Sequence, residues 1–275
     1  MSSPSANLEG LSERTVLRVS AVIAVASVMA RRPDALFAPQ FSWEDGPEWY
    51  QVARNFGFKS VGRVYNGYLG VPQRLAGLLV QPLPLRYAPL AFAVIAIIIQ
   101  ALPAIYIMSE RGRPFHRSRT VRAGIALICL WVPASVDTNS NLAHIQWHLF
   151  ILAAIMCAAA PAATVGQGVL DVLVILAAGL SAPSAFFLLP VVGLRFVLER
   201  NRRLVTWLVP LAMTFAAQAF AVVKWPDRRP HATLGPSIVG GARIIFNGRL
   251  SHRGGRPVVE DLSLKRDRLP AHLLT

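Results

Sequence analysis

Three stretches of the chain lack Asp, Glu, Lys and Arg altogether, and each is about as long as a membrane-spanning helix. They are residues 88–108, 142–163 and 204–223. About 20 residues in a helix cover the roughly 30 Å of hydrocarbon in a bilayer. Within that hydrocarbon every backbone N–H and C=O group needs a partner, and a helix supplies these partners from its own segment. The sequence therefore predicts a helical membrane protein.

Shorter or interrupted apolar runs lie at residues 15–30, 123–136 and 169–194, and the last is broken by the Ser-Ala-Pro-Ser sequence of residues 181–184. The composition, 54% hydrophobic and 15% charged, also lies outside the usual range of a soluble domain. We expect an all-α, polytopic transmembrane helix bundle with about 6–7 membrane segments, some of them short or hairpin-like. Residues 1–223 would form this membrane domain, and residues 224–275 a polar, basic C-terminal tail.

The arginines of one loop orient this bundle in the inner (plasma) membrane. Residues 109–122 hold five arginines and one glutamate, which favours the cytoplasmic side. The loop of residues 31–87 then faces the extracytoplasmic side, and the N-terminus is cytoplasmic. Because the formal net charge of +14 is dispersed over loops and tail, we expect no nucleic-acid partner. The sequence does not indicate an oligomeric state.

Two topologies fit the run of residues 169–194. Residues 195–203 hold four arginines and one glutamate, so both flanks of the run look cytoplasmic and the run would be a helical hairpin. Pro183 suits the turn, since proline lacks the N–H donor and disfavours the helical conformation of the residue before it. A single tilted crossing would instead put the basic tail inside. We expect the hairpin, because long tails influence orientation less than short loops.

The extracytoplasmic face of this topology collects the residues that suit catalysis. Glu44 and Asp45 are adjacent carboxylates in the first loop, and either could deprotonate a hydroxyl group as a general base. An alternative is that Asp45 and Glu48 form a capping box at a helix that begins near Pro47. Candidate substrate-binding residues are Asn66, Arg74, Asn141, His144, Trp147 and His148. Arg74, Arg63 or a histidine could hold a phosphate group.

Metal binding and disulfide formation have weaker signals. His144 and His148 share one helical face, but Ile145 stands where the metalloprotease pattern has glutamate. A divalent metal shared with Asp45 stays an alternative; we assign no metal ligands and no certain cofactor. Cys129 and Cys157 both fall in apolar runs, where thiols act as small hydrophobic groups.

An amphipathic helix is expected at the outer interface, within residues 66–87. Leu75, Leu78, Leu79 and Leu83 recur there at roughly helical spacing. Such a helix can form one wall of a cleft that faces lipid.

The chain also resembles a known family. The marks are Trp43-Glu44-Asp45-Gly46, Asn66-Gly67-Tyr68-Leu69, Pro72-Gln73-Arg74-Leu75, Ala88-Pro89-Leu90 and Gln100-Ala101, followed by Asn141 with Trp147-His148-Leu149 and by Gly179-Leu180-Ser181-Ala182-Pro183. Residues 37–108 resemble the N-terminal part of bacterial multi-pass proteins predicted to be GT-C-type glycosyltransferases. The resemblance implies a polyprenyl-phosphate-sugar donor. It also implies that an acidic residue of the first outer loop is the catalytic base, which corresponds here to Asp45 or Glu44.

The leading hypothesis is thus a membrane glycosyltransferase that transfers a sugar from a polyprenyl-phosphate donor to an envelope acceptor, with Asp45 as base and Glu44 as its partner. Its expected partners are membrane lipid and the lipid-linked sugar. GT-C enzymes generally have more membrane helices than this chain. The alternatives are a non-catalytic, transporter-like or accessory protein for envelope glycolipids, and an inactive fragment of a larger glycosyltransferase.

Overall fold

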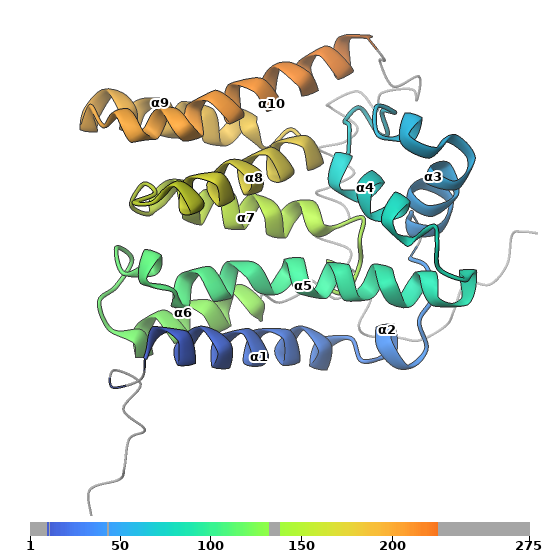
Figure 1. Cartoon of the computed structure of the whole chain (residues 1–275), viewed down its shortest axis with the longest axis horizontal. Helices are drawn as coiled ribbons and strands as arrows, with labels where there is room; N and C mark the ends of the chain where they lie inside the picture. Colours follow the sequence, from blue (N-terminus) through green and yellow to red (C-terminus); the bar gives the residue numbers. More distant parts are fainter. Residues whose placement is uncertain (1–9, 11, 43, 132–137, 225–275) are drawn as a thin grey trace, which may run out of the picture. The chain divides into compact units, whose positions relative to one another are not determined.

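The computed structural model describes residues 10, 12–42, 44–131 and 138–224, and these residues form helices and connecting loops (Figure 1). The expected all-helical fold is therefore confirmed for the described part of the chain, where the antiparallel pairing of Tyr65 with Tyr68 is an isolated bridge. The long helices are α1 (Glu13–Arg31), α5 (Ala88–Met108), α6 (Arg119–Leu130), α7 (Ile145–Ala158), α8 (Val165–Ser181), α9 (Ala185–Glu199) and α10 (Val205–Lys224).

Two helical segments of the described residues are long and apolar enough to cross a membrane: Leu85–Met108 and Arg202–Lys224. Two further apolar helices, α7 and α8, have fewer than the 18 residues that we require of a membrane-spanning helix. At about 1.5 Å per residue, the 14 residues of α7 cover roughly two thirds of a hydrocarbon core. The expected number of six to seven spans therefore stays a prediction. The basic tail and Trp43 lie outside the described residues.

Figure 1 shows the long helices stacked side by side, from α1 past α5, α7 and α8 to α10. Helix α5 is central, because it packs against α1, α6 and α7. Its buried surface carries small side chains, including Ala96, Ala101 and Ala104, which are at most 3% exposed. Small residues let neighbouring helix backbones approach closely, which is how helices associate where water provides no driving force.

The helix break expected at residues 181–184 is present. Helix α8 ends at Ser181, α9 begins at Ala185, and the Ser184 hydroxyl closes the turn by donating to the carbonyl of Ala178 at 3.0 Å. Arg195, near the end of α9, donates to the carbonyl of Ala159 just after α7, at 3.2 Å. The ends of α7 and α9 therefore lie together, as a helical hairpin requires.

The bundle has two chemically different ends. At one end the loop after α5, the end of α9 and the start of α10 bring together Arg111, Arg113, Arg117, Arg119, Arg122, Arg195, Arg200, Arg202 and Arg203, which we call the arginine-rich end. The chain between α1 and α5 forms the opposite end, which we call the carboxylate end after Asp34, Glu44, Asp45 and Glu48, although it carries basic residues as well. It contains α2 (Asp34–Phe37), the π-helical turn η2 (Asp45–Tyr50), α3 (Gln51–Phe56), η3 (Gly57–Ser60), α4 (Val71–Val80) and η4 (Leu85–Tyr87).

Helix α4 is the element expected as an interfacial helix, but it is shorter than the 66–87 segment. It begins after Gly70, whose positive φ of 55° ends the preceding turn. Its buried face carries Gln73 and Arg74, while Leu75 and Leu79 are 49% and 71% exposed. The buried face also carries Ala76, Gly77 and Val80, so α4 buries polar and small apolar side chains together and exposes two leucines.

Candidate functional site

Asp45 lies at the start of η2, and its side chain is directed into the protein. It is 3% exposed, and its two oxygens accept hydrogen bonds from the backbone amides of Ala143 (3.0 Å) and Leu142 (3.3 Å). Burial raises the pKa of Asp45 from 3.8 to about 7, although the two amides and Arg32 oppose this shift. Glu44 adds to the rise by like-charge repulsion.

These contacts correct the capping-box interpretation. The helical turn after Asp45 is closed by backbone bonds, in which the carbonyl of Glu44 accepts from Glu48 (2.9 Å) and Trp49 (3.2 Å). The carboxylate of Asp45 does not cap this turn; it reaches the two amides that precede α7. Asp45 therefore fixes the turn that leads into α7, from a distant part of the sequence.

Glu44 is partly exposed and faces two tyrosines. The hydroxyl of Tyr65 donates to Oε1 of Glu44 at 3.2 Å. Burial, and then the charge of Glu44, raise the pKa of Tyr68 to about 12, with Gln146 beside it. Tyr68 therefore keeps its proton at neutral pH. Glu44, Tyr65, Tyr68 and Gln146 form what we call the Glu44 cluster.

A tight turn brings the two tyrosines together. The backbone amide and carbonyl groups of Tyr65 and Tyr68 exchange hydrogen bonds of 2.9 and 3.1 Å. Asn66 and Gly67 between them have φ angles of 50° and 83°. An Asn-Gly pair with two positive φ angles is the preferred centre of a type I′ turn, so Asn66 has a role in the backbone turn; its expected role in substrate binding stays a prediction.

Arg74, expected to hold a phosphate, is instead part of the interior. Its side chain is 0% exposed, forms an ion pair with Glu48, donates to the Glu48 carbonyl at 2.6 Å and lies 4.7 Å from the ring centre of Trp49. Burial lowers the pKa of Arg74, whereas the charge of Glu48 raises it. With no exposed surface, Arg74 cannot reach a donor phosphate in this conformation. Arg63 is the exposed arginine nearby, with its guanidinium 4.1 Å from the ring centre of Phe56.

The remaining expected residues surround the start of α7. Asn141 is 6% exposed, and its side-chain oxygen accepts from the amide of Ala143 at 2.9 Å, so it also serves the helix start. His144 precedes α7 directly, and Trp147 is 55% exposed. Within the described residues, no three His, Cys, Asp or Glu side chains gather as a metal site would require. The divalent-metal alternative therefore gains no support there.

The sequence interpretation missed Gln146 and the interior groups around it. Several buried side-chain atoms near the carboxylate end make no hydrogen bond with any described residue: Trp49 Nε1, Arg74 Nε, Ser140 Oγ, His144 Nδ1 and Gln146 Oε1. Buried polar atoms in proteins nearly always have a partner, so this region suits a polar ligand. The available signal was the polar Gln146 between His144 and His148, within the uncharged run of residues 142–163.

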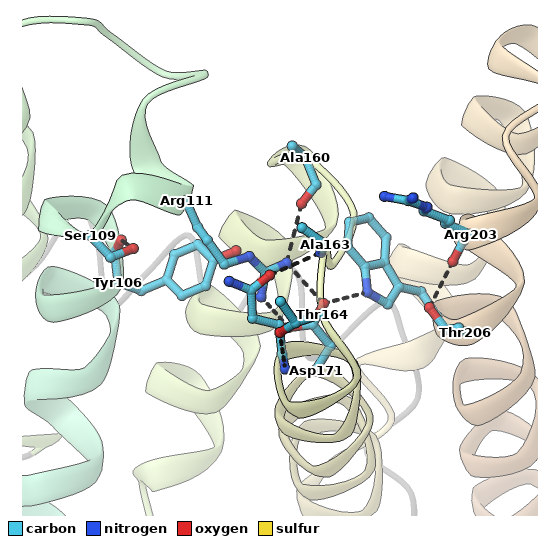
Figure 2. A network of polar contacts seen from close by, with 11 residues as sticks. Tyr106, Ser109, Arg111, Ala160, Ala163, Thr164, Asp171, Arg203 and Thr206 are labelled. Atoms are coloured by element: carbon cyan, nitrogen blue, oxygen red, sulfur yellow. Dashed lines mark hydrogen bonds and ion pairs between the residues drawn. The ribbon is translucent and has the colours of Figure 1, made fainter.

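A second polar network lies at the arginine-rich end (Figure 2). Asp171 of α8 is 0% exposed and forms a two-pronged ion pair with Arg111, of which the longer contact is 2.8 Å. The indole N–H of Trp207 in α10 donates to the same carboxylate at 2.9 Å. Arg111 also donates to the carbonyl of Ala160 after α7, at 3.2 Å. The network therefore ties the loop after α5 to α7, α8 and α10, which is a structural role.

Comparisons of the chain with protein-family models, with curated proteins and with solved structures find no match.

Proposed function

We propose that the bundle spans a membrane several times. The side chains support this, because many large apolar ones face outward while polar ones lie inside. Ile98, Ile128 and Val209 are 53%, 71% and 51% exposed, whereas Gln73, Gln100 and Gln218 are at most 2% exposed. Extensive exposed apolar surface indicates contact with a membrane or partner. The arginine-rich end is then cytoplasmic and the carboxylate end extracytoplasmic.

The function we propose for the carboxylate end is glycosyl transfer from a polyprenyl-phosphate sugar. The observation that carries it is the Glu44 cluster, in which three distant chain segments bring a carboxylate, two tyrosine hydroxyls and an amide together. Carbohydrate hydroxyls need such hydrogen-bonding groups, and aromatic rings offer surface to the faces of a sugar.

The chemistry can be written for this cluster. A carboxylate takes the proton of the acceptor hydroxyl, whose oxygen then attacks the anomeric carbon of the donor. The new glycosidic bond forms as the bond to the phosphate oxygen breaks, and polyprenyl phosphate leaves as an anion. An exposed arginine can stabilise that anion, and we assign this role to Arg63.

Glu44 and Asp45 have different roles in this proposal. Asp45 has a pKa near neutrality, but both its oxygens are already hydrogen-bonded and its side chain is buried. Glu44 is partly exposed and has one oxygen held by Tyr65. We therefore assign the base to Glu44. Asp45 is a positioning residue that fixes the neighbouring backbone to the start of α7.

The test uses membranes that contain the full chain and a panel of radiolabelled polyprenyl-phosphate sugars. We expect E44Q to reduce sugar transfer by a factor of roughly 100 or more, the range typical of a general base. D34N is the matched control, because the Asp34 side chain is 60% exposed and pairs with Arg32 alone among the described residues. Transfer that survives in E44Q with unchanged protein level would refute the assignment.

The non-catalytic alternative gives a different outcome. An accessory or transporter-like protein would bind the lipid-linked sugar at the Glu44 cluster without consuming it. The labelled donor would then be retained by the purified chain, lost in E44Q, and never converted to product.

A further inference from the structure

A pocket of about 540 Å³ opens at the arginine-rich end, between the start of α8 and the start of α10. Its volume lies within the range of small-molecule sites. The lining residues are mainly apolar. Arg203, in the 3-10 turn η7 (Arg202–Leu204) before α10, and Thr206 of α10 stand opposite Thr164, the N-cap of α8, and Val165. The pocket is far along the bundle from the Glu44 cluster, so it is a separate site.

The apolar residues that line the pocket form a stripe along α8. Val165, Val169 and Leu173 recur every four residues along α8 and are 85%, 55% and 58% exposed. This spacing places them in one stripe on the helix surface. Over eight residues the stripe runs about 12 Å away from the pocket mouth along α8. Such a stripe matches the beginning of an extended hydrocarbon chain rather than a compact polar molecule.

The mouth of the pocket is cationic and held in place. The amide of Arg203 donates to the Asn201 side chain at 3.0 Å, and the Thr206 hydroxyl donates to the Arg203 carbonyl at 2.7 Å. The Arg203 guanidinium itself forms no hydrogen bond or ion pair with another described residue. In Figure 2 its side chain extends toward the start of α8. Arg200 and Arg202 add exposed positive charge beside it.

The start of α8, across the mouth, is also preformed. The Thr164 hydroxyl accepts from the amide of Gln167 at 3.3 Å, and the Gln167 side chain accepts from the amide of Ala163 at 2.9 Å. These reciprocal bonds fix the first turn of the helix. One wall of the pocket is therefore formed by the capped start of α8, and the other includes Arg203, whose backbone is held by hydrogen bonds.

We infer that this pocket binds an anionic membrane phospholipid, with its phosphate on Arg203 and one acyl chain along Val165, Val169 and Leu173. A cation at the mouth and an apolar stripe leading away from it are complementary to a charged headgroup on a hydrocarbon tail. A free phosphate would use the arginine but not the stripe. The inference rests on the proposed membrane location and is independent of glycosyl transfer.

The experiment measures binding of fluorescent phosphatidylglycerol and phosphatidylcholine to the delipidated full chain in detergent. We expect R203Q to weaken phosphatidylglycerol binding roughly tenfold, as loss of a charge-assisted contact would. R117Q is the matched control, because Arg117 is exposed at the same end but does not line the pocket. It should change binding by less than about twofold.

A second pair of variants, which leaves the charge unchanged, tests whether the apolar stripe on α8 binds the acyl chain. V169W should fill the pocket and weaken phosphatidylglycerol binding, whereas V197W, at a position that is 67% exposed on α9, should not. Circular dichroism and gel filtration verify that each variant stays folded. Equal effects of R203Q and R117Q, equal affinity for phosphatidylcholine, or displacement of the lipid by millimolar inorganic phosphate would each overturn the inference.

Discussion

The carboxylate of Asp45 accepts a hydrogen bond from the backbone amide of Ala143 at 3.0 Å, across 98 positions of sequence. Through this contact the loop that carries Glu44 is fixed to the start of α7. The same helix start provides Gln146, which lies beside Tyr68. The geometry of the Glu44 cluster therefore depends on the buried side chain of Asp45, the residue next to Glu44.

Stability should depend on pH through Asp45. Burial raises the pKa of Asp45 from 3.8 to about 7, so between these values the folded chain holds more protons than the unfolded chain. The contribution of Asp45 to stability is then largest below pH 4, falls as the pH rises toward 7 and levels off above it. The full shift corresponds to roughly 4 kcal/mol.

D45N should flatten this pH dependence, because asparagine does not titrate. Thermal unfolding of the detergent-solubilised chain between pH 4 and 8 measures it, with D34N as the exposed control. A wild-type chain whose stability rises over the same window would contradict the prediction.

Arg74 should be essential for stability. It is fully buried, pairs with Glu48 and stacks over Trp49. Truncation to alanine leaves the Glu48 carboxylate without this partner, and we expect a loss of about 3–5 kcal/mol. R86A, at an exposed arginine in the same region, should change unfolding free energy by less than about 1 kcal/mol. Similar losses in the two variants would show that the Arg74 contacts contribute little.

Gly179 should tolerate no side chain. A Cβ atom at this position of α8 would overlap the Thr214 side chain of α10, where the two helices cross closely. G179A should therefore destabilise the chain by about 1–3 kcal/mol despite the better helix propensity of alanine.

Gly193 of α9 provides the matched control for G179A. No atom lies within 4 Å of a Cβ built there, so G193A should be neutral or stabilising by roughly 0.5–1 kcal/mol. Comparison of the two unfolding midpoints measures the packing effect alone. Equal midpoints would mean that α8 and α10 can separate at no cost.

Substitutions of Arg111 and Asp171 should have strongly non-additive effects on stability. Asp171 is fully buried and also accepts from Trp207, so either single substitution leaves a buried polar group without its partner. A double-mutant cycle with R111Q and D171N should give a coupling energy of about 1–3 kcal/mol. The exposed Arg113–Glu110 pair is the control and should give less than about 1 kcal/mol. Additive effects in the first cycle would contradict the structural role of this network.

The two ends of the bundle should face opposite sides of the membrane. Single cysteines at Phe58, which is 84% exposed at the carboxylate end, and at Arg117 and Arg200 report on this, after Cys129 and Cys157 are replaced by alanine. In intact cells an impermeant maleimide should label position 58 and leave 117 and 200 unlabelled until the membrane is opened. Labelling of position 200 together with 58 would contradict the hairpin topology.

The sequence by itself determined the helical fold, the apolar character of the long segments and the arginine clusters of residues 109–122 and 195–203. It also predicted the break between α8 and α9. These properties follow from hydrophobic runs, proline positions and loop charges, which act within one segment of chain.

The tertiary structure alone decided what the polar residues do. In the sequence, Arg74 and Asp45 resemble exposed loop residues. In the structure Arg74 is buried against Glu48, and Asp45 bonds the turn that leads into α7. Gln146 reaches Tyr68, and Trp207 reaches Asp171, from separate helices. Such pairings depend on how helices cross and rotate against one another, because a local pattern specifies which face of a helix is apolar but not which distant residue will meet it.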